Sequence, residues 1–141
     1  IVGAGAAGMM AAYSAALNNH KVMIFEKNEK CGKKIYITGK GRCNITSSLE
    51  ISEHIKNIPG NGMFMFSAFK NYTNEDIIQM LEKNGVKVKE ERGNRIFPES
   101  DKAQDVLIAL EKELKKLEKM ETLKYLPNTI TRLKIMLKKK D

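Results

Sequence analysis

Three glycines near the start of the chain restrict its fold more than any other feature. Gly3, Gly5 and Gly8 form a G-x-G-x-x-G pattern that follows two apolar residues and opens an Ala-rich run. In a strand–turn–helix unit, the first glycine permits a tight turn, the second lets backbone amides approach a pyrophosphate, and the third lets the helix pack closely on the strand. The helix N-terminus adds free N–H donors and partial positive charge. The predicted diphosphate site is therefore the turn formed by Gly3, Gly5 and Gly8 with the helix N-terminus that follows it.

The segments around these glycines follow the strand, helix, strand order of an α/β fold of the Rossmann type. Ile1 and Val2 predict the end of a first strand. Ala6–Leu17 is rich in helix formers, and Lys21–Glu26 is a run of β-branched and aromatic residues. The sequence therefore predicts part of a parallel sheet, incomplete within this chain and followed by the start of a second region.

Glu26 ends the second predicted strand, 18 residues beyond Gly8. A carboxylate at this place can accept hydrogen bonds from both hydroxyls of a ribose, and it would repel a 2′-phosphate. FAD or NAD is therefore favoured over NADP. The alternative is an ordinary strand–turn–helix unit with a surface glutamate.

A second glycine-containing block lies in the loop-rich stretch Lys27–Thr46, which also predicts a short helix at Lys33–Ile37. The block reads TGKGRCN from Thr38 to Asn44. Its glycines allow the backbone to approach a ligand, and Lys40 and Arg42 can neutralise phosphate. A lysine-rich solvent loop is the alternative.

The two cysteines, Cys31 and Cys43, are too few for a disulfide framework and lack the spacing of a metal site. No metal is predicted, and a reducing, cytoplasmic compartment is expected. Cys43 lies beside cations that can lower a thiol pKa, which raises the hypothesis of a redox thiol. Without a second cysteine at C-x-x-C spacing, a packing or backbone role is favoured.

A helix–hairpin–helix region follows. Thr73 and Asp76 have the spacing of a capping pair, and Val86–Glu91 and Arg95–Phe97 predict a hairpin. Asp101 is the predicted N-cap of a strongly amphipathic helix that continues to about residue 118.

The net charge of +8 is concentrated at the end of the chain. Residues 1–111 hold 15 Lys and Arg against 13 Asp and Glu, whereas residues 112–141 hold 10 against 4. We therefore expect residues 1–118 to form the folded body and residues 119–141 an irregular basic tail. A nucleic-acid-binding arm or a membrane-surface helix is the alternative for the tail, but the near-neutral body argues against nucleic acid and membrane as partners.

Four segments of the chain carry a family resemblance. IVGAGAAG, EKNEKCGKK, ITGKGRCNIT and RIFPESDKAQDV resemble the bacterial NAD(P)/FAD-dependent oxidoreductases of the BaiN-like, aminoacetone-oxidase-like family, over Ile1 to about Leu117. The resemblance implies an FAD cofactor, a small-molecule substrate and NAD(P)H as a candidate electron donor. Carried over by position, it implies that the adenosine ribose region is held by Glu26 and Lys27, and that the FAD pyrophosphate is held by Gly3, Gly5, Ala6, Ala7 and Gly8. It implies that the flavin side is lined by Lys34, Thr38, Gly39, Gly41, Arg42, Cys43 and Asn44.

The resemblance also implies a longer chain, since members of the family continue into further segments that complete the flavin site. We therefore expect an N-terminal fragment that binds the ADP moiety of FAD. No residue pair identifies a general acid or base, so catalytic residues are not assigned. The alternatives are a fragment of an NAD-binding dehydrogenase, and an inactive truncated product with at most weak dinucleotide binding.

Overall fold

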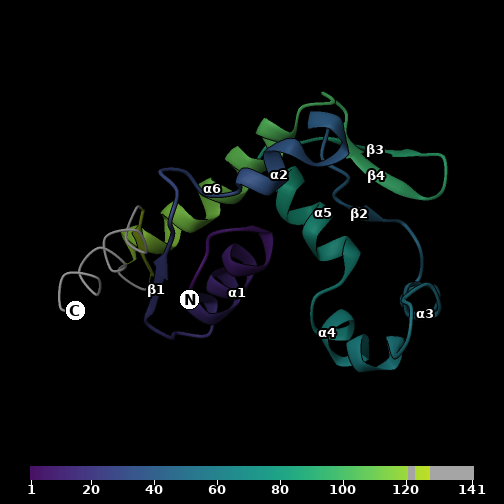
Figure 1. Cartoon of the computed structure of the whole chain (residues 1–141), viewed down its shortest axis with the longest axis horizontal. Helices are drawn as coiled ribbons and strands as arrows, with labels where there is room; N and C mark the ends of the chain where they lie inside the picture. The colour runs from purple at the N-terminus through teal and green to yellow at the C-terminus, as the bar shows by residue number, and fades with distance from the viewer. Residues whose placement is uncertain (121–122, 128–141) are drawn as a thin grey trace, which may run out of the picture. The chain divides into compact units, whose positions relative to one another are not determined.

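The computed structural model of the chain describes residues 1–120 and 123–127, and their contacts divide them into two units (Figure 1). The first unit contains Ile1–Ile37 and the described residues from Leu107 onward, and the second contains Thr38–Val106. The predicted diphosphate and ribose residues belong to the first unit. All but one of the predicted flavin-side residues belong to the second.

A parallel sheet forms the centre of the first unit. Strand β1 (Val22–Phe25) pairs in parallel with β5 (Leu123–Leu126) along one edge. Along its other edge, Phe25 forms a parallel bridge with Val2. Three chain segments thus run side by side in one direction, which confirms the predicted start of a Rossmann-type sheet.

Helix α1 (Ala6–Leu17) has the predicted bounds and lies against β1 (Figure 1). Its buried residues Met9, Ala12 and Ala16 recur at spacings of three and four, so they form one stripe toward the sheet. Ile24 of β1 is also fully buried. The small side chains of α1 let the helix and the strand approach closely, as the third glycine of the motif requires.

Two further helices belong wholly or partly to the first unit. Helix α2 (Lys33–Ile37) has the predicted bounds. Helix α6 (Ala103–Lys119) begins in the second unit and continues into the first. In the first unit, its side chains are buried at spacings of one, three and four residues, which confirms the predicted amphipathic face. These residues are Ala109, Leu110, Leu114 and Leu117.

Strand β5 requires a correction to the expected irregular tail. The tail was predicted over residues 119–141, and within it the structure describes 119–120 and 123–127. Leu123–Leu126 forms a strand whose Leu126 carbonyl accepts a hydrogen bond from the Glu26 N–H at 3.1 Å. Four residues are too few for hydrophobic periodicity to identify a strand. The extended conformation of this segment is instead stabilised by its pairing with β1. The rest of the predicted tail lies outside the described residues.

The second unit combines a small antiparallel sheet with short helices. Strands β2 (Thr46–Ser47), β4 (Arg95–Pro98) and β3 (Val88–Glu91) lie side by side in that order. The β3–β4 hairpin confirms the prediction, and its turn residues Gly93 and Asn94 both have positive φ. The helices of this unit before α6 are η1 (Thr38–Gly41), α3 (Ile51–Lys56), η2 (Gly62–Met65), α4 (Phe66–Asn71) and α5 (Asn74–Lys83).

The predicted capping pair at the start of α5 is confirmed. Thr73 Oγ1 accepts a hydrogen bond from the Asp76 N–H at 3.1 Å, and the Asp76 carboxylate accepts one from the Thr73 N–H at 2.7 Å. The two bonds satisfy donors that a helix N-terminus otherwise leaves without partners.

The prediction of Asp101 as the N-cap of α6 is wrong. The helix begins at Ala103, and Asp101 has a φ of +56°. Its carboxylate accepts hydrogen bonds from Arg42 Nε at 2.8 Å and from Lys89 Nζ at 2.7 Å. Asp101 therefore forms ion pairs with residues distant in the sequence and does not cap the helix.

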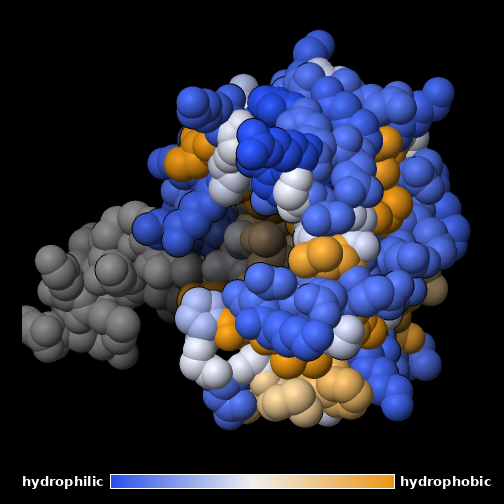
Figure 2. Space-filling model, turned by 90° about the vertical axis from the view of Figure 1, so that its right-hand side faces the viewer, coloured by the Kyte–Doolittle hydropathy of each residue, from blue (hydrophilic) through white to orange (hydrophobic). Residues whose placement is uncertain are grey.

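Most of the surface shown in Figure 2 is hydrophilic, with separate apolar areas. In the second unit, Met63, Phe64 and Phe66 are exposed large apolar residues. Within residues 1–120 and 123–127, every helix is too short or too polar to cross a lipid bilayer.

Candidate dinucleotide-binding site

The glycine turn joins the end of the first strand segment to helix α1. The Gly3 N–H donates to the Phe25 carbonyl at 2.7 Å, and Gly3 has a φ of +94° that favours glycine. Gly5 precedes α1 with extended backbone, φ −78° and ψ −175°. The chain therefore leaves the sheet at Gly3 and enters the helix two residues later.

The first turn of α1 presents free backbone donors. The Met9 N–H donates to the Gly5 carbonyl at 2.9 Å, which is the first bond of the helix. The amides of Ala6, Ala7 and Gly8 come before it and have no acceptor within the helix. Ala6 and Ala7 are exposed. These donors, with the positive end of the helix dipole, can bind an anion such as a diphosphate.

Two of the glycines differ sharply in the space around them. A Cβ at Gly8 would lie 1.9 Å from the Gly3 carbonyl oxygen and 3.0 Å from its carbon. A Cβ at Gly5 would have no heavy atom of the described residues within 4 Å. Gly8 therefore permits the packing of helix on turn, whereas Gly5 keeps open the space that a ligand needs to approach the amides.

Glu26 ties the end of β1 to the glycine turn. The side chain is 5% exposed. One carboxylate oxygen accepts from the Ala4 N–H at 2.6 Å, and the other accepts from the N–H and the Nδ2 of Asn28 at 2.8 and 2.7 Å. Burial is the largest influence and raises the pKa of Glu26, but the hydrogen bonds from Asn28 and Ala4 together outweigh it and lower the pKa below its usual value.

The position of Glu26 bears on its predicted contact with a ribose. A carboxylate offers about four lone-pair positions. Ala4 and Asn28 donate three hydrogen bonds to Glu26, and the Lys27 backbone N–H donates as well. The carboxylate points to the glycine turn, beside the amides that would hold the diphosphate. Sequence analysis missed the bonds from Ala4 and Asn28. The polar Asn28 two residues after the acid was the available signal for one of them, since asparagine side chains often bond within turns.

The remaining predicted residues of the first unit are two lysines. Lys27 and Lys34 are both exposed. Lys27 directly follows Glu26, and Lys34 is the second residue of α2. The first unit thus brings the diphosphate residues and Glu26 together around one turn.

The predicted flavin-side block from Thr38 to Asn44 is a tight loop in the second unit. Gly39, Lys40 and Gly41 have φ of +57°, +58° and +87° in succession, and Cys43 has +63°. The Arg42 N–H donates to the Gly39 carbonyl at 3.2 Å, and the Cys43 N–H donates to the Thr38 carbonyl at 3.1 Å. Two non-glycine residues in the left-handed region make this loop locally strained.

Arg42, predicted to contact the flavin side, has its charge engaged within the second unit. Its guanidinium pairs with the carboxylates of Glu91 and Asp101 and lies 4.4 Å from the centroid of the Phe97 ring. Lys40 is exposed, and no hydrogen bond or ion pair joins its ammonium group to the part of the chain that the structure describes. Of the two cations that the sequence offered for phosphate, Lys40 is the one whose charge stays available.

Cys43 is buried, and burial raises its pKa above the ordinary value. A redox thiol requires the opposite shift, because the thiolate is the nucleophile. The packing role favoured by the sequence therefore has the better physical support.

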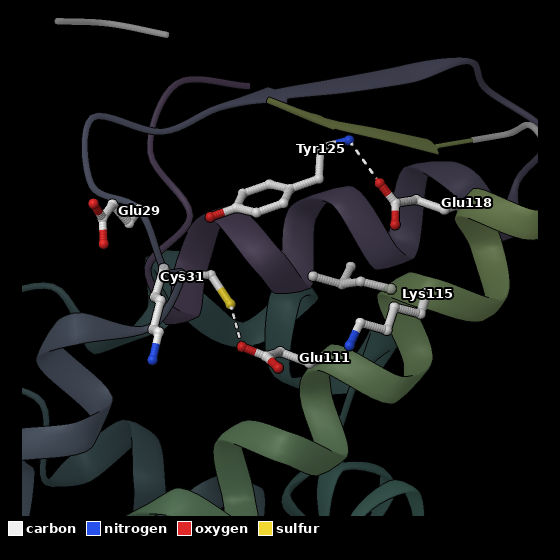
Figure 3. A pocket seen from close by; sticks show the side chains of 8 residues that line it. Glu29, Cys31, Glu111, Lys115, Glu118 and Tyr125 are labelled. Carbon is white, nitrogen blue, oxygen red and sulfur yellow. Dashed lines mark hydrogen bonds between the residues drawn. The ribbon is translucent and has the colours of Figure 1, made fainter. Parts of the chain in front are cut away.

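Cys31 lies beside a cavity of about 220 Å³ in the first unit (Figure 3). Its thiol donates to the Glu111 carboxylate at 3.1 Å. The hydroxyl of Tyr125, which also lines the cavity, is buried and has no hydrogen-bond partner among the residues described. Burial raises the pKa of Cys31 to about 12, and the hydrogen bond and negative charge of Glu111 add to the effect.

We expect Cys31 to resist alkylation in the folded chain. With a pKa of about 12, only about one thiol in 10,000 is ionised at pH 8. Iodoacetamide should modify a Cys43→Ser chain, in which Cys31 is the one remaining thiol, far more slowly in buffer than in 8 M urea. Modification in buffer at the rate of the unfolded chain would contradict this environment for Cys31.

Comparison with known proteins agrees with this geometry. The family model described as "HI0933-like protein Rossmann domain" matches residues 1–134. The 3-dehydro-bile acid delta(4,6)-reductase of Clostridium scindens is 36% identical over 119 residues, which are 82% of this chain and 28% of that protein. The ribosomal RNA dihydrouridine synthase of Haemophilus influenzae is 34% identical over 97 residues, 69% of this chain and 24% of the relative. The Escherichia coli protein of the same name is 32% identical over 117 residues, 82% and 28% of the two chains.

The chain thus spans about a quarter of the length of these relatives. Among solved structures, THI4 of Thermovibrio ammonificans matches with a TM-score of 0.52 and 16% identity, over 89% of this chain and 36% of that one. This likeness supports the fold alone. The family model extends past the motifs that suggested the resemblance, to residue 134 of 141. The chain therefore belongs to the HI0933-like Rossmann-domain family, and the resemblance inferred from its sequence is confirmed.

Proposed function

We propose that this chain is the dinucleotide-binding part of an FAD-dependent oxidoreductase. The observation that carries the proposal is the turn between Gly3 and Gly8, where exposed helix N-terminal amides lie beside a buried, ionised Glu26. FAD, when bound, supplies hydride transfer to or from a small organic substrate, and NAD(P)H is the proposed electron donor. The chain's own residues supply binding and orientation.

The residues present fit a dinucleotide. The space at Gly5 lets a diphosphate reach the amides of Ala6, Ala7 and Gly8. Glu26 is held ionised at neutral pH beside them, so its negative charge is placed to attract ribose hydroxyls. The same charge would repel a 2′-phosphate. These features support FAD or NAD over NADP.

FAD is preferred over NAD because of the Thr38–Asn44 loop. A simple NAD-binding turn gives no reason for a second glycine loop with a free cation at Lys40. The names of the relatives, a reductase and two dihydrouridine synthases, agree with redox chemistry. Two of those names concern ribosomal RNA, but the near-neutral charge of residues 1–111 favours a small molecule for this chain.

Calorimetric titration of the purified chain with nucleotides tests the proposal. We expect 5′-ADP and FAD to bind, and 2′,5′-ADP to bind at least about tenfold more weakly than 5′-ADP, because one repulsive charge contact is worth about 1.4 kcal/mol or more. Circular dichroism on the same sample checks that the chain is folded. A folded chain that binds neither ADP nor FAD, or that prefers the 2′-phosphate, would contradict the proposal. Binding of NAD with no binding of FAD would identify the NAD alternative.

A further inference from the structure

The Thr38–Asn44 loop is connected to the β3–β4 hairpin by a cluster of charges within the second unit. Arg42 Nε and Nη2 donate to Asp101 Oδ1 at 2.8 and 2.6 Å, and Nη2 also donates to the Glu91 carboxylate. Lys89 Nζ lies 2.7 Å from Asp101 Oδ2 and 3.7 Å from Glu91 Oε1. The cluster contains two cations and two anions, so its net charge is zero.

The aromatic ring of Phe97 adds a second contact on the same guanidinium. It lies on β4, and the guanidinium carbon of Arg42 is 4.4 Å from the ring centroid. A Cβ at Gly39 would meet the edge of the same ring at 3.4 Å. Phe97 therefore packs against both ends of the turn that Gly39 and Arg42 delimit, and Arg42 has little freedom to swing toward a ligand.

The loop needs such an anchor because its backbone is unfavourable. Lys40 and Cys43 each adopt left-handed φ, which side-chain-bearing residues rarely do without surrounding restraint. The Arg42 guanidinium also holds the pKa of Glu91 below its usual range, as expected when the carboxylate is stabilised in its charged form.

We infer that Arg42 is a positioning residue: its ion pairs with Glu91 and Asp101 hold the Thr38–Asn44 loop in its left-handed form, the form in which the loop can bind a flavin. This inference rests on the proposed function. Arg42 itself does not serve as a ligand for phosphate in this arrangement, because its charge is neutralised by two carboxylates. Lys40 is the cation that the ordered loop presents.

Glu91→Gln separates the positioning role from direct phosphate binding. If Arg42 bound phosphate, loss of the Glu91 charge would leave the guanidinium paired with Asp101 alone and more available to phosphate, and FAD binding would be unchanged or stronger. If Arg42 positions the loop, Glu91→Gln and Arg42→Gln should each weaken FAD binding by about tenfold, and the double variant should be little weaker than either single variant. The affinity for ADP should stay within about twofold of the unaltered chain, since the ADP residues lie in the first unit.

Glu53→Gln is the matched control. Glu53 forms an exposed ion pair with Lys56 at 2.5 Å in the same unit. The variant loses one negative charge without touching the Arg42 cluster, and it should bind FAD as the unaltered chain does.

Limited trypsin digestion of the ligand-free chain tests the loop without any nucleotide. Cleavage after Lys40 should be at least about tenfold faster in Glu91→Gln than in Glu53→Gln, because release of the anchor exposes the loop to the protease. Equal cleavage in the two variants would overturn the inference even if FAD binds. If the unaltered chain binds neither ADP nor FAD but Glu91→Gln is still cleaved faster than Glu53→Gln, the proposed function and the flavin contact are overturned while the anchoring role of Arg42 is retained.

Discussion

Gly8→Ala is expected to destabilise the chain by about 3 kcal/mol, at the upper end of the usual cost of overpacking. The added Cβ would lie 1.9 Å from the Gly3 carbonyl oxygen, and a backbone group cannot move aside as the end of a flexible side chain can. Helix α1 or the turn must shift, and the amides of its first turn shift with it. Urea unfolding followed by circular dichroism measures the loss, and calorimetry with ADP should show no binding.

Gly5→Ala is the matched variant for this prediction. It adds the same methyl group three residues earlier, where no heavy atom of the described residues lies within 4 Å. The expected loss of stability is below about 1 kcal/mol, the range of helix N-cap replacements. The affinity for ADP should nevertheless fall at least about tenfold, because the methyl group occupies the approach of the diphosphate. Unaltered ADP binding by Gly5→Ala would exclude the glycine turn as the phosphate site.

Glu26→Gln is expected to lower the free energy of unfolding by about 2 kcal/mol at pH 7, the range for hydrogen bonds to a charged group. The carboxylate accepts three hydrogen bonds from Ala4 and Asn28. An amide can accept on one side only, so an N–H donor would face another N–H donor on the other side. ADP affinity should fall as well, because the turn loses its connection to β1.

The effect of Glu26→Gln should depend on pH in a defined direction. The folded chain lowers the pKa of Glu26, so ionised Glu26 stabilises the fold above the ordinary glutamate pKa of about 4.3. This contribution is lost as the pH falls through the lowered pKa of the folded state. The stability difference between the unaltered chain and Glu26→Gln, measured by urea unfolding at pH 7, 5, 4 and 3, should therefore shrink toward acid pH. A difference that stays constant down to pH 3 would show that the Glu26 charge does not support the turn.

Short-range patterns predicted the local elements well. Helices α1 and α2 have the bounds expected from their sequences, and the capping pair at Thr73 starts α5 as expected. These features depend on residues within about four positions of each other, so the spacing of residue types along the sequence is enough to predict them. The glycine pattern is of the same kind, because a positive φ at Gly3 is a local requirement.

Contacts between distant residues were not predictable in this way. Asp101 was expected to cap a helix, but it pairs with Arg42, 59 positions earlier. Residues 123–126 were expected to be irregular, but they pair with β1, about 100 positions earlier. A carboxylate or a four-residue segment is compatible with several local roles. Only the partner that the fold brings close determines which of them it adopts.

The amino-acid sequence by itself determined the Rossmann-type start of the chain, the glycine turn and the family, because each depends on residue types at short, ordered spacings. The tertiary structure decided which side chains keep a free charge for a ligand. Ala4 and Glu26 are 22 positions apart, and Arg42 and Glu91 are 49 apart. Folding places these donors and carboxylates within hydrogen-bonding distance. As a result, Glu26 stabilises the glycine turn and Arg42 stabilises the Thr38–Asn44 loop, while the charge of Lys40 remains available to a ligand.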